Sequence, residues 1–418
     1  MNEYHSQYVW KYIPRLLTPI FQSAIRDHPI VVVTGARQVG KSTLLEHAYP
    51  TCDWPTLTMD DLDVLNEAKR DPASLLFGKS QIIIDEIQKA PQLLSEIKRL
   101  VDKNHRNIRL VLSGSANLLL MEQVSETLAG RAVFLTLDSM TIRESRSLPQ
   151  SKILENLFQG RWPEERPSKV ESPSLASLLV RGLIPPVLFL QEQTSVTQWW
   201  EGYVSTFLER DLRSVSRIDS LPDFRRCMTA LAIRSGQMLN QTEIARDIGV
   251  PQPTLHRYIN LVDVMCLLHR VPVYTVNPTK RLMKTPKIYW FDTGLAAYLS
   301  GYYDEASLTK ASEWGSFFEG LVFQHLRVWS SLQIPKARLY YWRTTTGKEV
   351  DFVIEYGRSL IAIEVKTNEN ARYKDLENLR MFLRDYPKQT VAGVLIYTGS
   401  EIKQMDEKIV AIPWHQIL

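Results

Sequence analysis

The sequence predicts an α/β protein: a parallel sheet with intervening helices comes first, then helical segments, and then a small second α/β region. Between residues 30 and about 145, short β-branched apolar runs alternate with helical patterns. A glycine-rich octet directly follows the first of these runs. Strand patterns return near residue 350, on both sides of a glycine turn. Uninterrupted apolar runs are typical of parallel strands that are buried on both faces.

The octet predicts a site for a nucleoside triphosphate. It has the pattern G-x-x-x-x-G-K-[ST] and lies between an apolar run at residues 30–33 and a helical pattern. Backbone N–H groups of such a turn, together with the helix N-terminus, bind phosphates. We expect Lys41 to reach the β- and γ-phosphates and the Ser42 hydroxyl to bind Mg²⁺. The residues expected to contact ATP here are Gly35, Ala36, Arg37, Gln38, Val39, Gly40, Lys41, Ser42 and Thr43.

A second apolar run, at residues 81–85, ends in two adjacent carboxylates. Ligands of parallel sheets bind at the carboxyl ends of the strands, where Asp85 and Glu86 should lie. We expect Asp85 to hold the Mg²⁺ and Glu86 to orient or deprotonate the attacking water. Acidic pairs are also common on solvated helix ends, but three preceding isoleucines favour the strand-end interpretation.

A third run, at residues 109–112, leads into a polar segment that we expect near the γ-phosphate. Its candidates are Ser115 and Asn117, with Ser113 as a further option. Further strands are predicted at residues 56–59 and 132–137, and a lead-in helix within residues 1–28.

These motifs resemble a known family. The phrases TGARQVGKS (34–42), IDEIQ (84–88), SGS (113–115) and ETLAGR (126–131) are similar to those of prokaryotic AAA-type P-loop ATPases with a largely uncharacterised C-terminal half. The resemblance continues over residues 203–212, although Leu183 stands where the family usually has a second glycine. It implies ATP hydrolysis in a homo-oligomeric ring. Either Arg131 or Arg210 could then reach a neighbouring subunit's γ-phosphate, although each also fits a solvated or salt-bridged helix face.

Composition limits the classes of protein that fit. With 418 residues, two or three domains are expected, and 44% hydrophobic and 23% charged residues are ordinary for a globular protein. A net charge of +4 permits local nucleic-acid contacts but does not argue for them. The three widely separated cysteines, the absence of a signal-peptide pattern and the absence of an apolar run near the ~18 residues that span a bilayer predict a cytoplasmic protein without a membrane partner.

We expect four regions along the chain. They are an AAA-type ATPase domain (1–147), a linker and helical segment (148–235), a winged-helix domain (236–300) and a restriction-endonuclease-like domain (301–418). Residues 148–173 are rich in proline, serine and charge and are interpreted as a surface linker.

The winged helix is predicted from a capped helix after Asn240, a turn at Gly249 and a second helix over about 251–268. Such a module could bind DNA or serve as the lid of the ATPase. The exposed side of its second helix would carry Gln252, Thr254, His256 and Arg257. The basic residues that follow could touch phosphates or form a solvated stretch: Lys280, Arg281, Lys284 and Lys287.

A second candidate site lies near the C-terminus. Glu319 on a helix, Asp351 on a strand and Glu364-x-Lys366 on the next strand resemble the layout of restriction-endonuclease-like nucleases, including archaeal Holliday-junction resolvases. Asp351 and Glu364 would hold Mg²⁺, Lys366 would position water or neutralise charge, and Glu319 would complete the metal shell. Glu-x-Lys is also an ordinary strand pattern. Residues that could follow the nucleic-acid backbone are Arg372, Tyr373, Lys374 and Arg380.

Together these patterns predict an ATP-hydrolysing DNA-processing protein. The ATPase ring would remodel or translocate DNA, with branched DNA as the favoured substrate, and the nuclease-like region would cut or grip it. The alternative is a nucleotide-dependent switch or scaffold that binds a protein partner, or DNA, without cleaving it.

Overall fold

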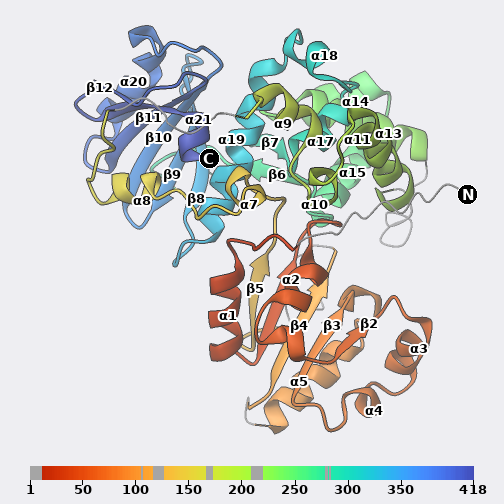
Figure 1. The fold of residues 1–418 in the computed structure, drawn as a ribbon. Helices are drawn as coiled ribbons and strands as arrows, with labels where there is room; N and C mark the ends of the chain where they lie inside the picture. The colour runs from red at the N-terminus through yellow and green to blue at the C-terminus, as the bar shows by residue number, and fades with distance from the viewer. Residues whose placement is uncertain are drawn as a thin grey trace, which may run out of the picture. The chain divides into compact units, whose positions relative to one another are not determined.

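The structure is a computed structural model that describes residues 12–104, 107–115, 127–165, 173–208, 220–277, 281 and 284–418. Predictions for Asn117, Arg210 and Lys280 lie outside the described residues. The chain forms two compact units (Figure 1). The first comprises residues 1–140, 184–191 and 262–267, and the second comprises residues 141–183, 192–261 and 268–418.

The first unit contains a five-stranded parallel sheet, as predicted. Its strand order is β2-β3-β4-β1-β5, so β4 lies between the strand before the glycine-rich loop and the strand before the acidic pair. The strands are β1 (Ile30–Thr34), β2 (Thr56–Thr58), β3 (Gln81–Asp85), β4 (Arg109–Gly114) and β5 (Ala132–Thr136). These bounds confirm the predicted strands to within one residue at each end. Because all pairings are parallel, the carboxyl ends of the strands meet at one edge.

Six α-helices of the described residues accompany this sheet in the first unit (Figure 1). They are α1 (Thr18–Asp27), α2 (Lys41–His47), α3 (Leu62–Arg70), α4 (Pro72–Leu76), α5 (Leu93–Lys103) and α10 (Pro185–Leu188). On one face of the sheet, apolar side chains of α5 pack against alternate residues of β1, β3 and β4. Helix α1 begins later than the predicted lead-in helix, since residues 13–15 have no regular structure.

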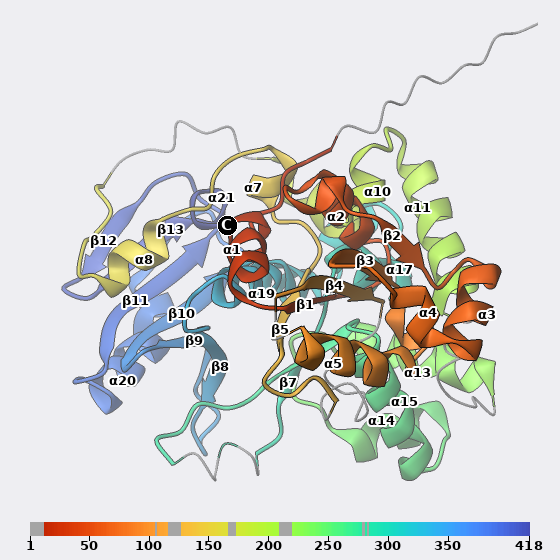
Figure 2. The same ribbon diagram turned by 90° about the horizontal axis from the view of Figure 1, so that it is seen from below.

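The predicted linker contains a helix, α8 (Ile153–Phe158), and this expectation was wrong for that stretch. Leu154 and Leu157 lie three residues apart, so they share a face of the helix, and both are buried. Helix α8 packs along β10 and β11 of the C-terminal sheet (Figure 2). The surrounding proline, serine and charge obscured this short apolar pair in the sequence.

The middle of the chain is helical, as expected. Its elements include α7 (Ile142–Ser145), α9 (Leu175–Arg181), α11 (Gln193–Gly202), a π-helix (Tyr203–Leu208), α17 (Thr293–Leu299) and α18 (Glu305–Thr309). A hydrogen bond joins the loop after α9 to the start of α17. Gly182, with φ 80°, follows α9, and Asp292, the N-cap of α17, accepts the Leu183 N–H at 2.9 Å. A Cβ on Gly182 would lie 2.0 Å from Asp292 Oδ1. The geometry of this loop therefore depends on Gly182, with Leu183 fully buried beside it.

The described residues of the 221–290 stretch include three longer helices and an antiparallel pair of strands. They are α13 (Leu221–Ile233), α14 (Gln241–Ile248), α15 (Gln252–Val264), β6 (Leu268–Val271) and β7 (Lys287–Trp290). Asn240 caps α14 by accepting the Glu243 N–H, and Gly249 ends the helix at φ 70°. Met238 bridges antiparallel to Lys287 and adds a third short strand position.

The C-terminal sheet has six strands in the order β12-β13-β11-β10-β9-β8. They are β8 (Arg338–Arg343), β9 (Glu349–Tyr356), β10 (Ser359–Lys366), β11 (Thr390–Tyr397), β12 (Lys403–Asp406) and β13 (Ile409–Pro413). Strands β9 and β10 pair antiparallel across Gly357, as predicted, while β10 and β11 are parallel. The helices of this region are α19 (Trp314–Ser331), α20 (Glu377–Asp385) and α21 (Trp414–Ile417), and α20 covers the face that carries Leu360 and Ala362.

Within the described part of the chain, no helix is both long enough and apolar enough to cross a bilayer. The three cysteines form no disulfide with one another; Cys52 is exposed, and Cys227 and Cys266 are buried.

Candidate nucleotide site and acidic cluster

The glycine-rich loop joins β1 to α2, and its backbone requires glycine at both ends. Gly35 has φ 151°, and a Cβ there would lie 2.1 Å from the Leu137 carbonyl oxygen. Gly40 has φ 92° and caps α2. Gln38 also has a positive φ, 65°, so the loop turns sharply before the helix begins. Successive N–H groups of such a turn form a concave anion site.

Lys41 lies folded over this loop. Its Nζ donates to the carbonyl oxygens of Gly35 at 3.0 Å and Ala36 at 2.9 Å, and the residue is 7% exposed. Burial lowers the pKa of Lys41, while the nearby Glu86 and Asp85 carboxylates act in the opposite direction. The ammonium is therefore held inside the loop where the phosphates of a nucleotide would bind.

Asp85 ends β3 and receives donors from three directions. The Ser42 hydroxyl donates to Asp85 Oδ2 at 3.0 Å, the Glu86 N–H donates to Oδ1 at 3.0 Å, and the Ser113 hydroxyl donates to Oδ1. Ser42 and Asp85 thus come together from the two predicted motifs. A hydroxyl and a carboxylate are the oxygen ligands that Mg²⁺ prefers, so this pair fits the metal of a metal–nucleotide complex.

Glu86 has a left-handed backbone, with φ 54°, which is uncommon for a residue other than glycine. Its Oε2 accepts from the Ser115 hydroxyl at 3.1 Å and from the Gln88 side-chain amide. Gln88 also donates to Ser115 Oγ at 3.2 Å. Gln88 was not among the predicted site residues, although its place two residues after the acidic pair was a usable signal.

Arg15 is a second residue that the sequence did not reveal. It is 4% exposed, and its guanidinium donates to the Val39 carbonyl at 2.6 Å and to the Asp138 carbonyl at 2.7 Å. It therefore ties the glycine-rich loop to the segment that follows β5. No local motif marks such an arginine, because both partners are backbone atoms distant in sequence.

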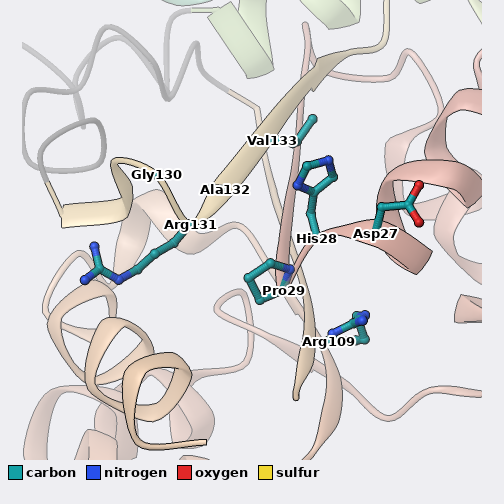
Figure 3. Close-up of a pocket in the computed structure, with 8 residues that line it drawn as sticks. All are labelled: Asp27, His28, Pro29, Arg109, Gly130, Arg131, Ala132 and Val133. Carbon is teal, nitrogen blue, oxygen red and sulfur yellow. The ribbon is translucent and has the colours of Figure 1, made fainter. Parts of the chain in front are cut away.

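Arg131 lies at the opposite edge of the sheet, where the strands begin. It forms a bidentate ion pair with Asp102, in which Nε donates to Oδ1 at 2.7 Å and Nη2 donates to Oδ2 at 2.8 Å. It borders a surface hollow of about 330 Å³ at the amino ends of β1, β4 and β5 (Figure 3). The lining residues are Asp27, His28, Pro29, Arg109, Gly130, Arg131, Ala132 and Val133. Arg131 is thus separated from the glycine-rich loop of its own chain, and its action on a neighbouring subunit stays a prediction.

The predicted C-terminal set comes together in the second unit. Glu319 projects from α19, Asp351 from β9, and Glu364 and Lys366 from one face of β10. Lys366 Nζ lies 2.6 Å from Glu364 Oε1, and Asp351 Oδ2 accepts the Val365 N–H at 2.8 Å.

An unexpected residue joins this set. Lys287 of β7 is 3% exposed, and its Nζ lies 2.9 Å from Glu319 Oε1 and 2.5 Å from Glu349 Oε1. The expectation that Lys287 could touch phosphates from the surface is therefore wrong. The same holds for Arg281, which lies between the rings of Tyr274 and Tyr340, while Lys284 is exposed.

Burial dominates the electrostatics of this cluster. Desolvation, opposed by Lys287, raises the pKa of Glu319 to about 7. Desolvation and the Asp351 carboxylate raise the pKa of Glu364 to about 8. Desolvation alone would lower the pKa of Lys287, but the surrounding carboxylates raise it. In the described residues no group of three or more His, Cys, Asp or Glu side chains is arranged to hold a metal ion.

On α15, Gln252, His256 and Arg257 are exposed, and Thr254 is partly so. Arg372, Tyr373, Lys374 and Arg380 are also exposed, and they flank the start of α20. These positions leave their side chains accessible to a large partner.

Comparison with known proteins identifies the family. An AAA domain model matches residues 27–145, and models described as domain of unknown function DUF8612 and domain of unknown function DUF4143 match residues 172–306 and 314–417. Uncharacterized protein Rv2008c of Mycobacterium tuberculosis is 30% identical over 397 residues, which covers 94% of this chain and 82% of the relative. The same values hold for uncharacterized protein Mb2031c of Mycobacterium bovis. The chain belongs to their family.

The family's N-terminal domain is an AAA-type P-loop ATPase domain, and in this chain it contains the whole glycine-rich loop and the acidic pair. Two solved structures show weaker likeness. The Walker-type ATPase PABY2304 of Pyrococcus abyssi is 16% identical, with a TM-score of 0.43 over 68% of this chain and 94% of that one. The Thermotoga maritima RuvB Holliday junction branch migration motor is 18% identical, with a TM-score of 0.30 over 64% and 93%. Scores in this range do not establish a shared fold over the aligned length.

Proposed function

We propose that this P-loop ATPase hydrolyses Mg–ATP between its glycine-rich loop and the acidic pair, and that the turnover acts on DNA bound by its C-terminal half. The observation that carries the catalytic part is the meeting of Ser42, Asp85 and Glu86 at one sheet edge. It joins a phosphate site, a fit for Mg²⁺ and a second carboxylate, Glu86, in the order that phosphoryl transfer needs.

Each residue has a role in this reaction. Lys41 exchanges the carbonyls of Gly35 and Ala36 for the β- and γ-phosphate oxygens. Ser42 and Asp85 hold Mg²⁺, which neutralises charge on the phosphates. A water positioned by Glu86 attacks the γ-phosphorus, its proton passes towards the carboxylate, and the bond to the β-phosphate oxygen breaks to leave ADP.

Ser115 and Gln88 hold the Glu86 side chain. They support its orientation towards the water, because a carboxylate fixed by two donors loses rotational freedom. In a homo-oligomeric ring, Arg131 of a neighbouring copy would supply the remaining positive charge, after it exchanges Asp102 for phosphate.

Two features support DNA as the partner. The order of helices and antiparallel strands over residues 221–290 supports a winged helix, in which the second helix of the helix-turn-helix would enter a groove. Its outer residues, Gln252, His256 and Arg257, are exposed. The exposed basic and aromatic residues before and on α20 add groups that suit phosphates and bases.

The test is ATP turnover by the full chain with single strands, duplexes, forks and four-way junctions. We expect DNA to stimulate turnover, and Lys41→Ala to abolish it with or without DNA. Arg257→Ala should raise the DNA concentration for half-maximal stimulation about fivefold, on the order of 1 kcal/mol. The control is Arg246→Ala, an exposed arginine on α14. Turnover indifferent to every DNA would refute this partner and favour a switch that binds protein.

DNA cleavage is a second candidate function, favoured by one specific observation. The element order α19-β8-β9-β10-α20-β11 brings Glu319, Asp351, Glu364 and Lys366 together, as in restriction-endonuclease-like nucleases. Incubation of labelled junctions and forks with Mg²⁺ or Mn²⁺, comparing the natural chain with Asp351→Ala, tests it. Cutting that Asp351→Ala abolishes would establish the nuclease.

A further inference from the structure

The acidic cluster near the C-terminus contains a cation supplied by the chain itself. Lys287 Nζ lies 2.9 Å from Glu319 Oε1, 2.5 Å from Glu349 Oε1 and 4.0 Å from Asp351 Oδ1. The lysine is 3% exposed. A buried positive charge therefore lies among carboxylates from α19 and β9, and two of these, Glu319 and Asp351, belong to the predicted nuclease set.

The predicted metal ligands are also engaged on their other sides. Asp351 Oδ2 accepts the Val365 N–H at 2.8 Å, and Glu364 Oε1 accepts from Lys366 Nζ at 2.6 Å. Glu349, which is not part of the predicted set, accepts from Arg343 at 2.9 Å as well as from Lys287. Glu364 Oε2 is buried without a hydrogen-bond partner among the described residues, so one oxygen of the predicted metal pair is left over.

The strand that carries Lys287 is built to keep it there. Tyr289 is two residues further along β7, so it projects to the same side, and its hydroxyl donates to the same Glu319 oxygen. The Tyr289 ring stacks on Phe323 of α19, with centroids 4.4 Å apart. The ammonium also lies 5.8 Å from the centre of the Tyr341 ring. A swing of Lys287 away from the cluster would break its own ion pairs with Glu319 and Glu349 and its contact with the Tyr341 ring.

We propose that the Lys287 ammonium takes the place of a divalent cation among Glu319, Glu349 and Asp351, so that this cluster is an ion-pair lock and not a metal site. A divalent ion beside the ammonium would meet strong repulsion in a site with little water. Moving the Lys287 ammonium out of the cluster would cost much free energy, because the carboxylates left behind would be buried without a counter-charge. The lock fastens β7, which lies between β6 and the Met238 bridge, to α19 and β9.

This inference is independent of ATP turnover and of DNA stimulation. It bears on the second candidate function, because a nuclease of the predicted kind needs a metal ion to activate water. With Lys287 in place, the restriction-endonuclease-like sheet binds or docks and does not cut.

The test is Mn²⁺ binding by the full-length chain without nucleotide. Calorimetry measures the binding, and electron paramagnetic resonance measures the free Mn²⁺. Four proteins are compared: the natural chain, Asp351→Asn, Lys287→Met, and Lys287→Met with Asp351→Asn. We expect equal Mn²⁺ binding by the first two. Lys287→Met should gain one site that the added Asp351→Asn removes. Any Mn²⁺ bound at the glycine-rich loop is common to all four and cancels in the comparison.

Two results would overturn the proposal. One is an Mn²⁺ site in the natural chain that Asp351→Asn removes, a comparison that needs no Lys287 variant to fold. The other is a folded Lys287→Met protein that gains no site. Lys287→Arg keeps the charge and should bind no more Mn²⁺ than the natural chain. Lys348→Met removes an exposed ion pair with Glu377 and serves as the matched lysine control, with no gained site and an unchanged melting temperature.

Discussion

Protonation of one buried histidine should set part of the acid sensitivity of this protein. His325 of α19 is 4% exposed. Its Nε2 accepts the Ile142 N–H at 2.9 Å, while its Nδ1 lies 2.8 Å from the Leu321 carbonyl and must be the protonated nitrogen. The ring is therefore held neutral. A second proton would place an N–H against the Ile142 N–H, which has no other acceptor in this arrangement.

The magnitude follows from the pKa. Burial lowers the pKa of His325 from 6.5 to about 4, with smaller and opposed effects from the neighbouring Glu144 and Arg143. Because the folded pKa is the lower one, the unfolded chain binds more protons between about pH 4 and 6.5. The contribution of neutral His325 to the free energy of unfolding is therefore fully present above about pH 6.5, and it is lost as the pH drops towards 4. The loss is about 2 kcal/mol at pH 5 and about 3 kcal/mol at pH 4 and below.

Urea unfolding, followed by tryptophan fluorescence at pH 7, 6, 5 and 4.5, measures this effect. His325→Gln keeps an acceptor for the Ile142 N–H but cannot take up the proton, so its stability should fall less steeply with acid. Carboxylates that titrate in the same window affect both proteins equally, so the difference between the two profiles is the readout. His256→Gln, on the exposed side of α15, is the matched control. Parallel profiles for the natural chain and His325→Gln would refute the reasoning.

Three further outcomes are expected. Glu86→Gln should keep nucleotide binding and slow ATP turnover by at least about 100-fold, because the amide cannot take the water's proton. Single-turnover ATP hydrolysis measures this rate. An unchanged rate would remove Glu86 from its role. Arg15→Ala should raise the KM for ATP about tenfold with a smaller effect on kcat, since the carbonyl of the glycine-rich loop loses its donor; Arg15→Lys should restore part of it, and Arg26→Ala on the exposed side of α1 should do nothing. Gly182→Ala should lower the free energy of unfolding by roughly 2 kcal/mol or more in urea titrations, because its Cβ would collide with Asp292.

The strands of the first unit were predictable for a physical reason. Parallel strands are covered on both faces, so their sequences are continuous apolar runs, and residues 30–34 and 81–85 could be located without any partner. The glycine-rich loop was predictable because its backbone angles restrict the residue types, as Gly35 and Gly40 show. Helix α8 was missed because its two buried leucines lie in a polar stretch and only the sheet beneath them makes it a helix.

The sequence by itself determined the phosphate-binding loop, the acidic strand end, the helix-turn-helix caps and the order of strands that carry Asp351 and Glu364, since each depends on neighbours within a few residues. Only the tertiary structure decided where Arg15, Gln88 and Lys287 act. The partners of Arg15 and Lys287 are distant in sequence, and Gln88 reaches Ser115 as well as Glu86, which is only two residues away. A lysine in a basic stretch looks like a surface charge until the packing of β7 against α19 and β9 buries it. Long-range burial is set by the assembled fold, and here it places the Lys287 ammonium beside three carboxylates of α19 and β9.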